Sequence, residues 1–435
     1  MRSKYLFIVF AVLLLNACTN SNSRIREINL NFSTYGFSDP DRVPKPDRNY
    51  YPYFRFDGYE KEPVEKEWKV VELENQYVKV HILPEIGGKI WGAIEKSTGN
   101  EFLYYNSVVK FRNIGMRGPW TSGGIEFNFG IIGHSPHTST PVDYSIREND
   151  DGSVSCFIGG IDLLTRARWE TEVNLQPDNA YFTTTTWYSN PTSLLQPYYQ
   201  WSNAAYQAEG GLRMSFPGTY RIGHGGEADP WPISVDGKDL TVYGNNAYGG
   251  DKSYHIVGAA DGYFAAYYDD LNFGAGHYSN YGDKLGKKIW LWSHARSGRI
   301  WEDLLTDEDG QYVELQSGRL FNQASTRSTQ TPYKHFGFEP YAMDEFKEYW
   351  YPVMNIGGVV KANNTGALNI ISDGAGHSIY FSPLEPFNDE IYVFAGDELK
   401  QTFKVNLDPL EVWHQSVDVN LNEPVKIVVG ANQRL

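Results

Sequence analysis

Hydrophobic and polar residues alternate with a period of two in several stretches of the chain. Val78, Val80 and Ile82 alternate with polar neighbours, and residues 169–175 show the same pattern. This period puts successive side chains on opposite faces of a strand, so each stretch predicts a strand with one buried face. Windows with helical period are scarce, and aromatic residues make up 15% of the chain, a composition that favours strands.

Turn-forming residues separate the predicted strands. They cluster at residues 149–152, 177–179, 236–237, 261–262 and 309–310. These spacings suit antiparallel strands, and the sequence shows no repeat of solenoid or propeller length. We therefore predict an all-β protein built as one large antiparallel β-sandwich.

The first residues have a different pattern. Arg2 and Lys4 precede an apolar run over residues 5–15, which is typical of a secretory signal peptide. The run is too short to cross a bilayer, and residues 15–18 resemble the lipobox of bacterial lipoproteins, which implies cleavage before Cys18 and its lipidation. A plain secreted protein in which Cys18 has no role is the alternative.

The chain then divides into an N-terminal part and a sandwich. Prolines among polar and aromatic residues predict an irregular lead-in before the first clear alternation. The expected organisation is a signal peptide over 1–17, a lipid-anchored tether over 18–26, an irregular lead-in packed on the body over 27–65, and a β-sandwich domain over 66–435. A separate β-module after about 385 is the alternative. We expect the protein in the cell envelope, anchored to the outer membrane, with either face possible.

Charge and cysteine content restrict the partners. The formal net charge is −15, and removal of residues 1–17, which carry two cations and no anion, makes it −17. Such a surface argues against nucleic acid as a partner. Cys156 is the only cysteine after Cys18, so the domain has no internal disulfide. Its register with Val154 and Ile158 predicts a buried thiol.

Longer motifs give the chain a family resemblance. It resembles the bacterial DUF5107 family, placed among the galactose-mutarotase-like (aldose epimerase-like) folds. The similarity lies in residues 71–75, 82–91, 116–129, 286–288, 305–307, 312–319 and 348–353, and at His134, Trp201 and Asn203. It implies a supersandwich whose concave face receives a sugar ring. Because related sandwiches serve epimerases, lyases and plain sugar binders, the resemblance indicates the ligand class better than the reaction.

The resemblance also implies one catalytic residue. Mutarotation needs a general acid and a general base, and residues 312–316 resemble the late strand that carries the glutamate base of true mutarotases, which points to Glu314. The alternative is a strand glutamate that is paired with Arg319 or solvated. True mutarotases carry a histidine four residues before an asparagine, but Tyr199 has that place before Asn203. A phenol with a pKa near 10 is a poor acid, so simple aldose mutarotation is not expected.

A second candidate centre extends from Trp120 to His137. Paired glycines allow close backbone approach, Trp120 offers an aromatic platform, and Glu126 and His134 follow. Glu126 and Glu314 could form the carboxylate pair that glycoside hydrolysis requires. Alternatively, Glu126 fixes its loop by accepting backbone amides. Although His134 and His137 lie close together, no metal motif supports them, and we predict neither a metal nor a cofactor.

We therefore predict an envelope lipoprotein that acts on a glycan or oligosaccharide by hydrolysis, epimerisation or elimination, in that order. The expected catalytic residues are Glu314, Glu126 and His134. The expected substrate-binding residues are Trp120, His137, Tyr199, Trp201, Asn203, Gln316, Glu348 and Trp350. For the last two, a short helix with a solvated acidic face is the alternative. The competing functions are a non-catalytic glycan-binding lipoprotein that passes ligands to an outer-membrane glycan transporter, and a structural role in the envelope.

Overall fold

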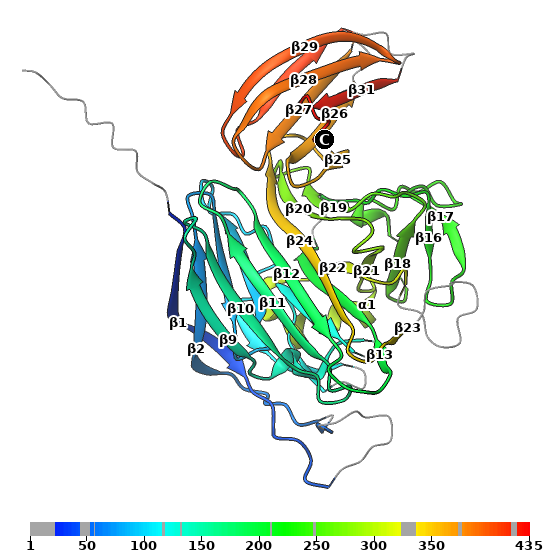
Figure 1. Cartoon of the computed structure of the whole chain (residues 1–435). Coiled ribbons are helices and arrows are strands. Elements are labelled where there is room, and N and C mark those ends of the chain that lie inside the picture. The colour runs from blue at the N-terminus through cyan, green and yellow to red at the C-terminus, as the bar shows by residue number, and fades with distance from the viewer. Residues whose placement is uncertain are drawn as a thin grey trace, which may run out of the picture.

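Two large β-sheets form the main body of the protein (Figure 1). The computed structural model describes residues 22–43, 53–55, 57–114, 118–130, 133–208, 211–246, 249–322, 336–372, 376–418 and 424–435. Among the described residues, neighbouring strands are antiparallel except for one short parallel pair, β1 (Arg24–Tyr35) with β5 (Val108–Lys110). The prediction of a large antiparallel β-sandwich is confirmed.

The first sheet has twelve strands. In spatial order they are β17 (Ala228–Pro230), β16 (Tyr220–Ile222), β18 (Lys252–Val257), β21 (Gly286–Leu291), β22 (Tyr312–Gly318), β14 (Gln200–Gln207), β8 (Ile125–Phe129), β4 (Lys89–Glu95), β3 (Val78–Leu83), β2 (Val64–Glu74), β1 (Arg24–Tyr35) and β5 (Val108–Lys110).

The second sheet has eight strands, β15 (Leu212–Ser215), β19 (Tyr263–Tyr268), β20 (Phe273–Ser279), β24 (Met343–Met354), β12 (Phe182–Ser189), β11 (Arg168–Leu175), β10 (Val154–Ile161) and β9 (Asp143–Glu148). Two small strand pairs flank the body, β13 (Gln196–Tyr198) with β23 (Phe336–Phe338), and β6 (Arg112–Asn113) with β7 (Pro119–Trp120). The helical segments are α1 (Arg296–Leu305) and the short 3-10 turns η1 (Pro136–Ser139), η2 (Tyr243–Asn245) and η3 (Asp307–Asp309).

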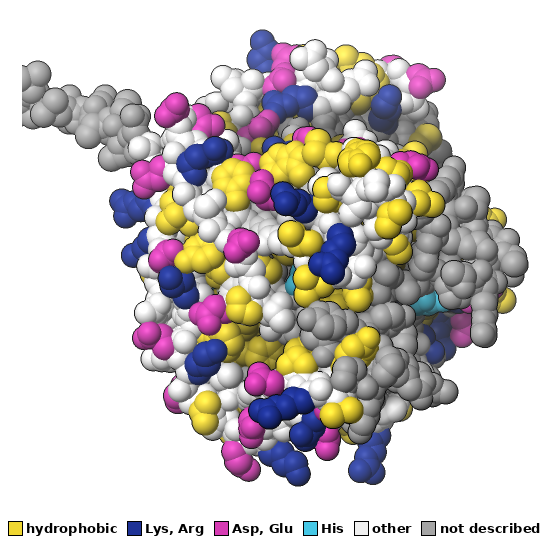
Figure 2. All heavy atoms as spheres, turned by 60° about the horizontal axis from the view of Figure 1, so that its bottom comes forward, with side chains coloured by type: hydrophobic (Ala, Val, Ile, Leu, Met, Phe, Trp, Pro, Cys, Tyr) yellow, Lys and Arg dark blue, Asp and Glu magenta, His cyan; other side chains and the backbone are white. Residues whose placement is uncertain are grey.

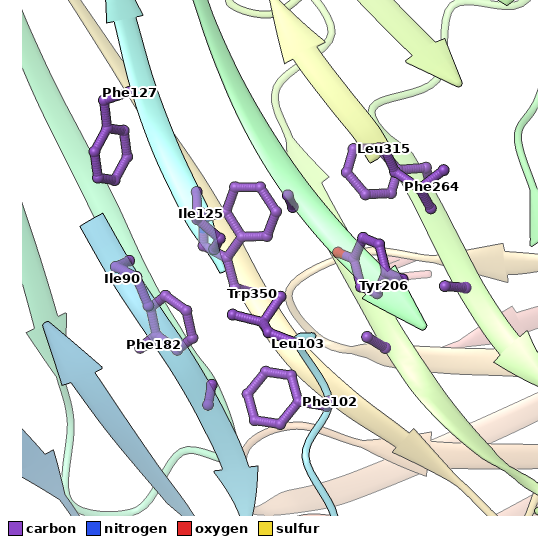
Figure 3. Packing of buried hydrophobic residues seen from close by; sticks show 14 of the residues in the cluster. Ile90, Phe102, Leu103, Ile125, Phe127, Phe182, Tyr206, Phe264, Leu315 and Trp350 are labelled. Atoms are coloured by element: carbon purple, nitrogen blue, oxygen red, sulfur yellow. The ribbon is translucent and has the colours of Figure 1, made fainter. Parts of the chain in front are cut away.

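Apolar side chains from the two sheets meet in one core. Figure 3 shows residues of this core, among them Phe127 and Leu315 from the first sheet and Phe182 and Trp350 from the second, and all four side chains are buried. Burial of one such side chain contributes about 1.5–3 kcal/mol. The period-two residues of β3 and β11 point into this core, and Cys156 is also buried there, as predicted. One face of each sheet is thus committed to packing against the other sheet.

The N-terminal region differs from the expected tether and irregular lead-in. Residues 24–35 form strand β1, which pairs with β2 from Arg24 opposite Glu74 to Thr34 opposite Val64. The physical reason is a period-two pattern in which Ile28, Leu30 and Phe32 pack beside Trp68. The predicted signal peptide and Cys18 lie outside the described residues.

The strands after Met354 form a smaller unit instead of extending the large sandwich. Its sheets are β25 (Lys361–Ala362), β26 (Gly366–Ser372), β27 (His377–Pro383) and β30 (Trp413–Val417), and β29 (Glu398–Leu407), β28 (Phe387–Ala395) and β31 (Val425–Val429). The unit, orange and red in Figure 1, has its own core and joins the main body through a second apolar cluster that includes Tyr267, Tyr351 and Leu384. The expected single body over 66–435 is therefore divided, near residue 360 and not near 385.

The surface carries charges of both signs. On the described part of the face shown in Figure 2, Lys and Arg side chains are interspersed with Asp and Glu side chains. This mixing leaves no extended basic patch on the described part of that face. Among the described residues, no helix has the length and apolar character needed to cross a bilayer.

Candidate functional site

A row of polar side chains crosses the first sheet on the face that points away from the second sheet. On β8 and β22, Phe127 and Leu315 face the core, so their neighbours Glu126, Glu314 and Gln316 face the opposite way. Asn203 on β14 pairs with Glu126 on one side and with Gln316 on the other. Strand alternation and register therefore gather residues that are far apart in the sequence.

Glu126 is held as a carboxylate at the centre of this row. It is buried and accepts hydrogen bonds from the side chains of Trp120, Asn128, His134 and Asn203 at 2.6, 3.2, 2.5 and 3.0 Å. Burial opposes its ionisation, but the neighbouring His134 and Lys89 and the hydrogen bonds lower its pKa to about 2. Because four donors already surround it, Glu126 has little capacity left for a substrate proton.

His134 is the part of the site that reaches the surface. Its side chain is 22% exposed, compared with 2% for Glu126, and its ring lies 5.2 Å from Trp120 and 5.0 Å from Trp201 between ring centroids. The carboxylate of Glu126 can only accept at His134 Nδ1, so it favours the tautomer with the proton on Nδ1. The lone pair of this tautomer is on Nε2.

Glu314 has the opposite electrostatic environment. Burial raises its pKa, and the negative charge of Glu126 adds to this effect, while His134 and Lys288 oppose it. Gln316 Nε2 donates to Glu314 Oε2 at 2.9 Å. Two carboxyl groups on one sheet face whose pKa values are pushed apart are suited to different protonation states, one ionised and one neutral.

Two buried lysines place positive charge next to the carboxyl groups of the site. Burial lowers the pKa of Lys89 and of Lys288 to about 8, although the site carboxylates oppose the shift. Lys89 Nζ donates to the Thr121 carbonyl oxygen at 2.6 Å and lies 5.4 Å from the Trp120 ring centroid. Sequence reasoning assigned no role to Lys89. The sequence feature that could have indicated a role for Lys89 is its place between two glycines and the apolar run of β4.

Local backbone geometry explains how Trp120 and Glu126 reach the row. Gly124 has a φ of 58°, and a Cβ at this position would lie 1.9 Å from the Ile90 carbonyl oxygen. Only glycine permits this approach of β8 to β4. The tight contact sets the start of β8 and hence which of its residues face outward.

The structure brings most of the predicted site residues together. Trp120, Glu126, His134, Trp201, Asn203, Glu314 and Gln316 share one sheet face or border it. Tyr199 packs beside Trp201 and Leu320. Arg319 does not pair with Glu314, because its guanidinium binds Asp344 at 2.9 Å. Their catalytic and substrate-binding roles stay predictions.

Glu348 and Trp350 were placed wrongly at the rim of the site. Both lie on β24, a central strand of the second sheet, and both are completely buried between the sheets. Glu348 binds His277 and Lys284 at 3.0 and 3.2 Å, and Trp350 donates to Thr184 at 3.0 Å. The suggested short helix is also wrong, since β24 is a strand. A buried ion pair and a core indole produce the same acidic and aromatic pattern as a sugar site.

His137 also lies away from the row. Its ring stacks on Trp169 at 4.9 Å and on Phe129 at 6.2 Å, and Phe129 faces the core. Turn η1 begins between His134 and His137 and sends the two rings in different directions. Within the part of the chain that the structure describes, no group of three or more His, Cys, Asp or Glu is placed to hold a metal ion.

Comparisons with known proteins identify relatives. The model of a domain of unknown function, DUF5107, matches residues 45–353. A TPR-domain containing protein from Parabacteroides distasonis is 25% identical, with a TM-score of 0.67 over 77% of this chain and 56% of that one. The chain thus matches little more than half the length of that protein.

Two further solved structures are similar at lower identity. The Slr1438 protein of Synechocystis is 12% identical, with a TM-score of 0.47 over 66% of this chain and 96% of that one. A galactose mutarotase-like protein from Lactobacillus casei is 10% identical, with a TM-score of 0.45 over 65% of this chain and 99% of that one.

Proposed function

Since this chain belongs to the DUF5107 family, whose function is not assigned, we propose from its site that it is an acid/base enzyme that acts on carbohydrate. The observation that carries the proposal is the hydrogen bond from His134 Nδ1 to ionised Glu126, beside a second glutamate whose pKa is raised. Together they supply a base and an acid.

In this mechanism His134 is the general base. Its Nε2 removes a proton from a sugar hydroxyl or ring carbon, and Glu126 stabilises the imidazolium that forms, as a buried carboxylate does in other histidine dyads. Glu314, whose pKa is raised by burial and by Glu126, donates a proton to the oxygen that gains charge. Glu126 is therefore a positioning residue and not the acid/base group that the sequence suggested.

The surroundings of His134 suit a sugar. Indole rings of Trp120 and Trp201 flank the imidazole, and apolar faces of this kind pack against the C–H face of a pyranose. The amides of Asn203 and Gln316 next to the carboxyl groups can bind hydroxyls in both directions. This combination of a few polar groups with aromatic walls is usual for ligand sites.

Among the three reactions that the sequence suggested, hydrolysis by two carboxylates fits least well. That reaction needs both carboxyl groups to face the substrate, whereas the oxygens of Glu126 already accept from four side chains. Epimerisation and elimination need one base and one acid, which His134 and Glu314 supply. We therefore place epimerisation or elimination before hydrolysis.

A second function, sugar binding without turnover, has one observation in its favour. Glu314 is only 4% exposed, and Trp120 and Trp201 are each 3% exposed, so a ligand that arrives from the surface first meets His134, which is 22% exposed. A binder that delivers glycans to an outer-membrane transporter needs no more than this contact.

The test is proton NMR of the anomeric region during incubation with a panel of oligosaccharides. New reducing ends indicate hydrolysis, altered couplings indicate epimerisation, and vinyl signals indicate elimination. We expect turnover by the wild-type protein, loss in H134Q, and no change in the control E345Q, whose side chain is exposed. Line broadening by wild type without any product supports the binding function instead.

The cellular location is a separate proposal. The lipobox-like residues 15–18 support attachment of the protein to the outer membrane through acylated Cys18. Membrane fractionation of cells that express wild type or C18A tests it. Release of C18A from the membrane supports the anchor, and unchanged membrane association contradicts it.

A further inference from the structure

A hollow separate from the His134 site lies where turn η1 meets strands β10 and β11. It has a volume of about 280 Å³, and its apolar lining includes Val142, Ile161, Leu163 and Leu164. A shallower hollow of about 640 Å³ adjoins it along β9 to β12 and shares Gly159, Gly160 and Trp169 with it. None of the residues that form the His134 site lines either hollow.

Two buried polar atoms at this cavity lack partners among the described residues. Trp169 is 3% exposed, and its Nε1 has no hydrogen-bond acceptor. Nε2 of His137, whose ring stacks on Trp169, is also buried and unpartnered. An unsatisfied buried group costs about 1–3 kcal/mol, and such groups are rare in folded proteins. A ligand oxygen that accepts from the indole would remove this cost.

Gly160 leaves the approach to the indole open. A Cβ at Gly160 would meet only Trp169 Nε1, at 3.9 Å. In contrast, a Cβ at Gly159 would come within 2.6 Å of the Trp169 carbonyl oxygen, so Gly159 is required for strand packing. The fold therefore does not require glycine at position 160, and the space that this glycine leaves belongs to the cavity.

The charges around the cavity select the ligand. Asp143 and Asp162 line it, and no Lys or Arg is among its lining residues. Burial lowers the pKa of His137 to about 4, which keeps the ring neutral at neutral pH. An anion finds no positive partner here, and a cation cannot accept from an indole N–H. A neutral hydroxyl fits both kinds of lining group, because it accepts a hydrogen bond from the indole N–H and donates one to a carboxylate.

We propose that this cavity is a second carbohydrate site, which seats one neutral sugar residue against Trp169 and His137. The adjoining hollow extends it along the outer face of the second sheet, where Phe157 and Trp187 offer aromatic surface, and where Glu170 offers an acceptor and Arg168 offers donors. The site would hold a glycan chain independently of chemistry at His134. It does not rest on the proposed enzymatic function.

The test is calorimetric titration with neutral gluco-, manno-, xylo- and galacto-oligosaccharides of about five units, and with a sulfated oligosaccharide. G160V fills the cavity, and W169F removes the indole N–H together with part of the ring. For the best neutral ligand we expect at least tenfold weaker binding in G160V. W169F should weaken it about three- to tenfold, which corresponds to one hydrogen bond. The control G244A changes a glycine with open space around it and should bind like wild type.

Thermal unfolding separates this role from a structural one. G160V adds its side chain where a Cβ would meet only Trp169 Nε1, at 3.9 Å, so it should melt near the wild-type temperature while it binds more weakly. W169F also removes ring volume from a buried stack with His137 and Phe129, so it should melt below wild type. H134Q should bind this ligand unchanged, and product formation followed by NMR reports on the other site separately. Unchanged affinity in W169F and G160V, preference for the sulfated ligand, or no binding of any neutral sugar by wild type would each overturn the proposal.

Discussion

Substitution of Lys284 by Met tests the buried ion cluster between the two sheets. Lys284 and Glu348 are both completely buried, with Lys284 Nζ 3.2 Å from Glu348 Oε2 and 2.7 Å from Gln200 Oε1. Glu348 also accepts from His277 and Ser202 at 3.0 and 2.7 Å. Burial lowers the pKa of Lys284 to about 8, while Lys284 and His277 hold the pKa of Glu348 at about 2 against burial.

The expected loss of stability in K284M follows from the balance between desolvation and the attraction of the two charges. Desolvation of the ammonium offsets much of what the carboxylate gains, so the intact pair contributes little net stability. Removal of one partner leaves a buried, uncompensated charge, which costs about 3–5 kcal/mol. Met keeps much of the aliphatic volume over Phe346, so little of this loss comes from packing. We expect K284M to lower the free energy of unfolding at pH 7 by this amount.

Urea unfolding followed by tryptophan fluorescence measures the effect at pH 7 and at pH 4. In K284M the pKa of Glu348 rises above its unfolded value, and a carboxyl group with a raised pKa destabilises more as pH increases. The loss should therefore be smaller at pH 4 than at pH 7. The double variant K284M/E348Q should recover most of the stability, and the exposed control K347M should change it by less than about 0.5 kcal/mol. Equal losses at both pH values, or no recovery in the double variant, would refute the reasoning.

Three further predictions concern pH, backbone and catalysis. Burial lowers the pKa of His277 and of His137 to about 4, below the unfolded value of 6.5. Between these pH values the unfolded chain binds more protons, so the free energy of unfolding of the wild type should fall from pH 6.5 to pH 4 in chemical denaturation. A flat profile would contradict the buried neutral rings. G124A should lower the free energy of unfolding by at least about 1–3 kcal/mol, because residue 124 has a positive φ and its new Cβ would meet the Ile90 carbonyl oxygen. The control G244A should keep the wild-type stability. Equal melting temperatures of the two variants would contradict this. E126Q should lower kcat about a hundredfold or more with little change in KM, because His134 keeps its place but loses the carboxylate that stabilises its imidazolium form. A change in KM alone would assign Glu126 to substrate binding.

Strand alternation made the fold predictable. The apolar residues of β3 and β11 had a clear period of two, and together with regular turn signals they were enough for an antiparallel sandwich. The same signal was present at Ile28, Leu30 and Phe32, but nearby prolines suggested an irregular segment. The division near residue 360 was not predictable, because period two does not show which sheet a strand joins.

The candidate site was predictable only in part, because the sequence does not show which sheet a strand joins. The Trp120 motif continues into β8, only β14 separates β8 from β22 of the Glu314 motif in the same sheet, and register brought them together. Glu348 and Trp350 belong to a strand of the other sheet, and sequence cannot tell a buried acid with a lysine partner 64 positions away from an acid at a ligand site. The saturation of Glu126 by four donors is likewise a tertiary property.

The pH profile of kcat/KM for wild type and E314Q tests the central claim most directly. Because a general acid must hold its proton, the wild-type rate should fall on the alkaline side where Glu314 ionises. The account predicts that E314Q is much slower and lacks this fall. An E314Q protein with the wild-type rate and the same pH profile would contradict the assignment of Glu314 as the acid.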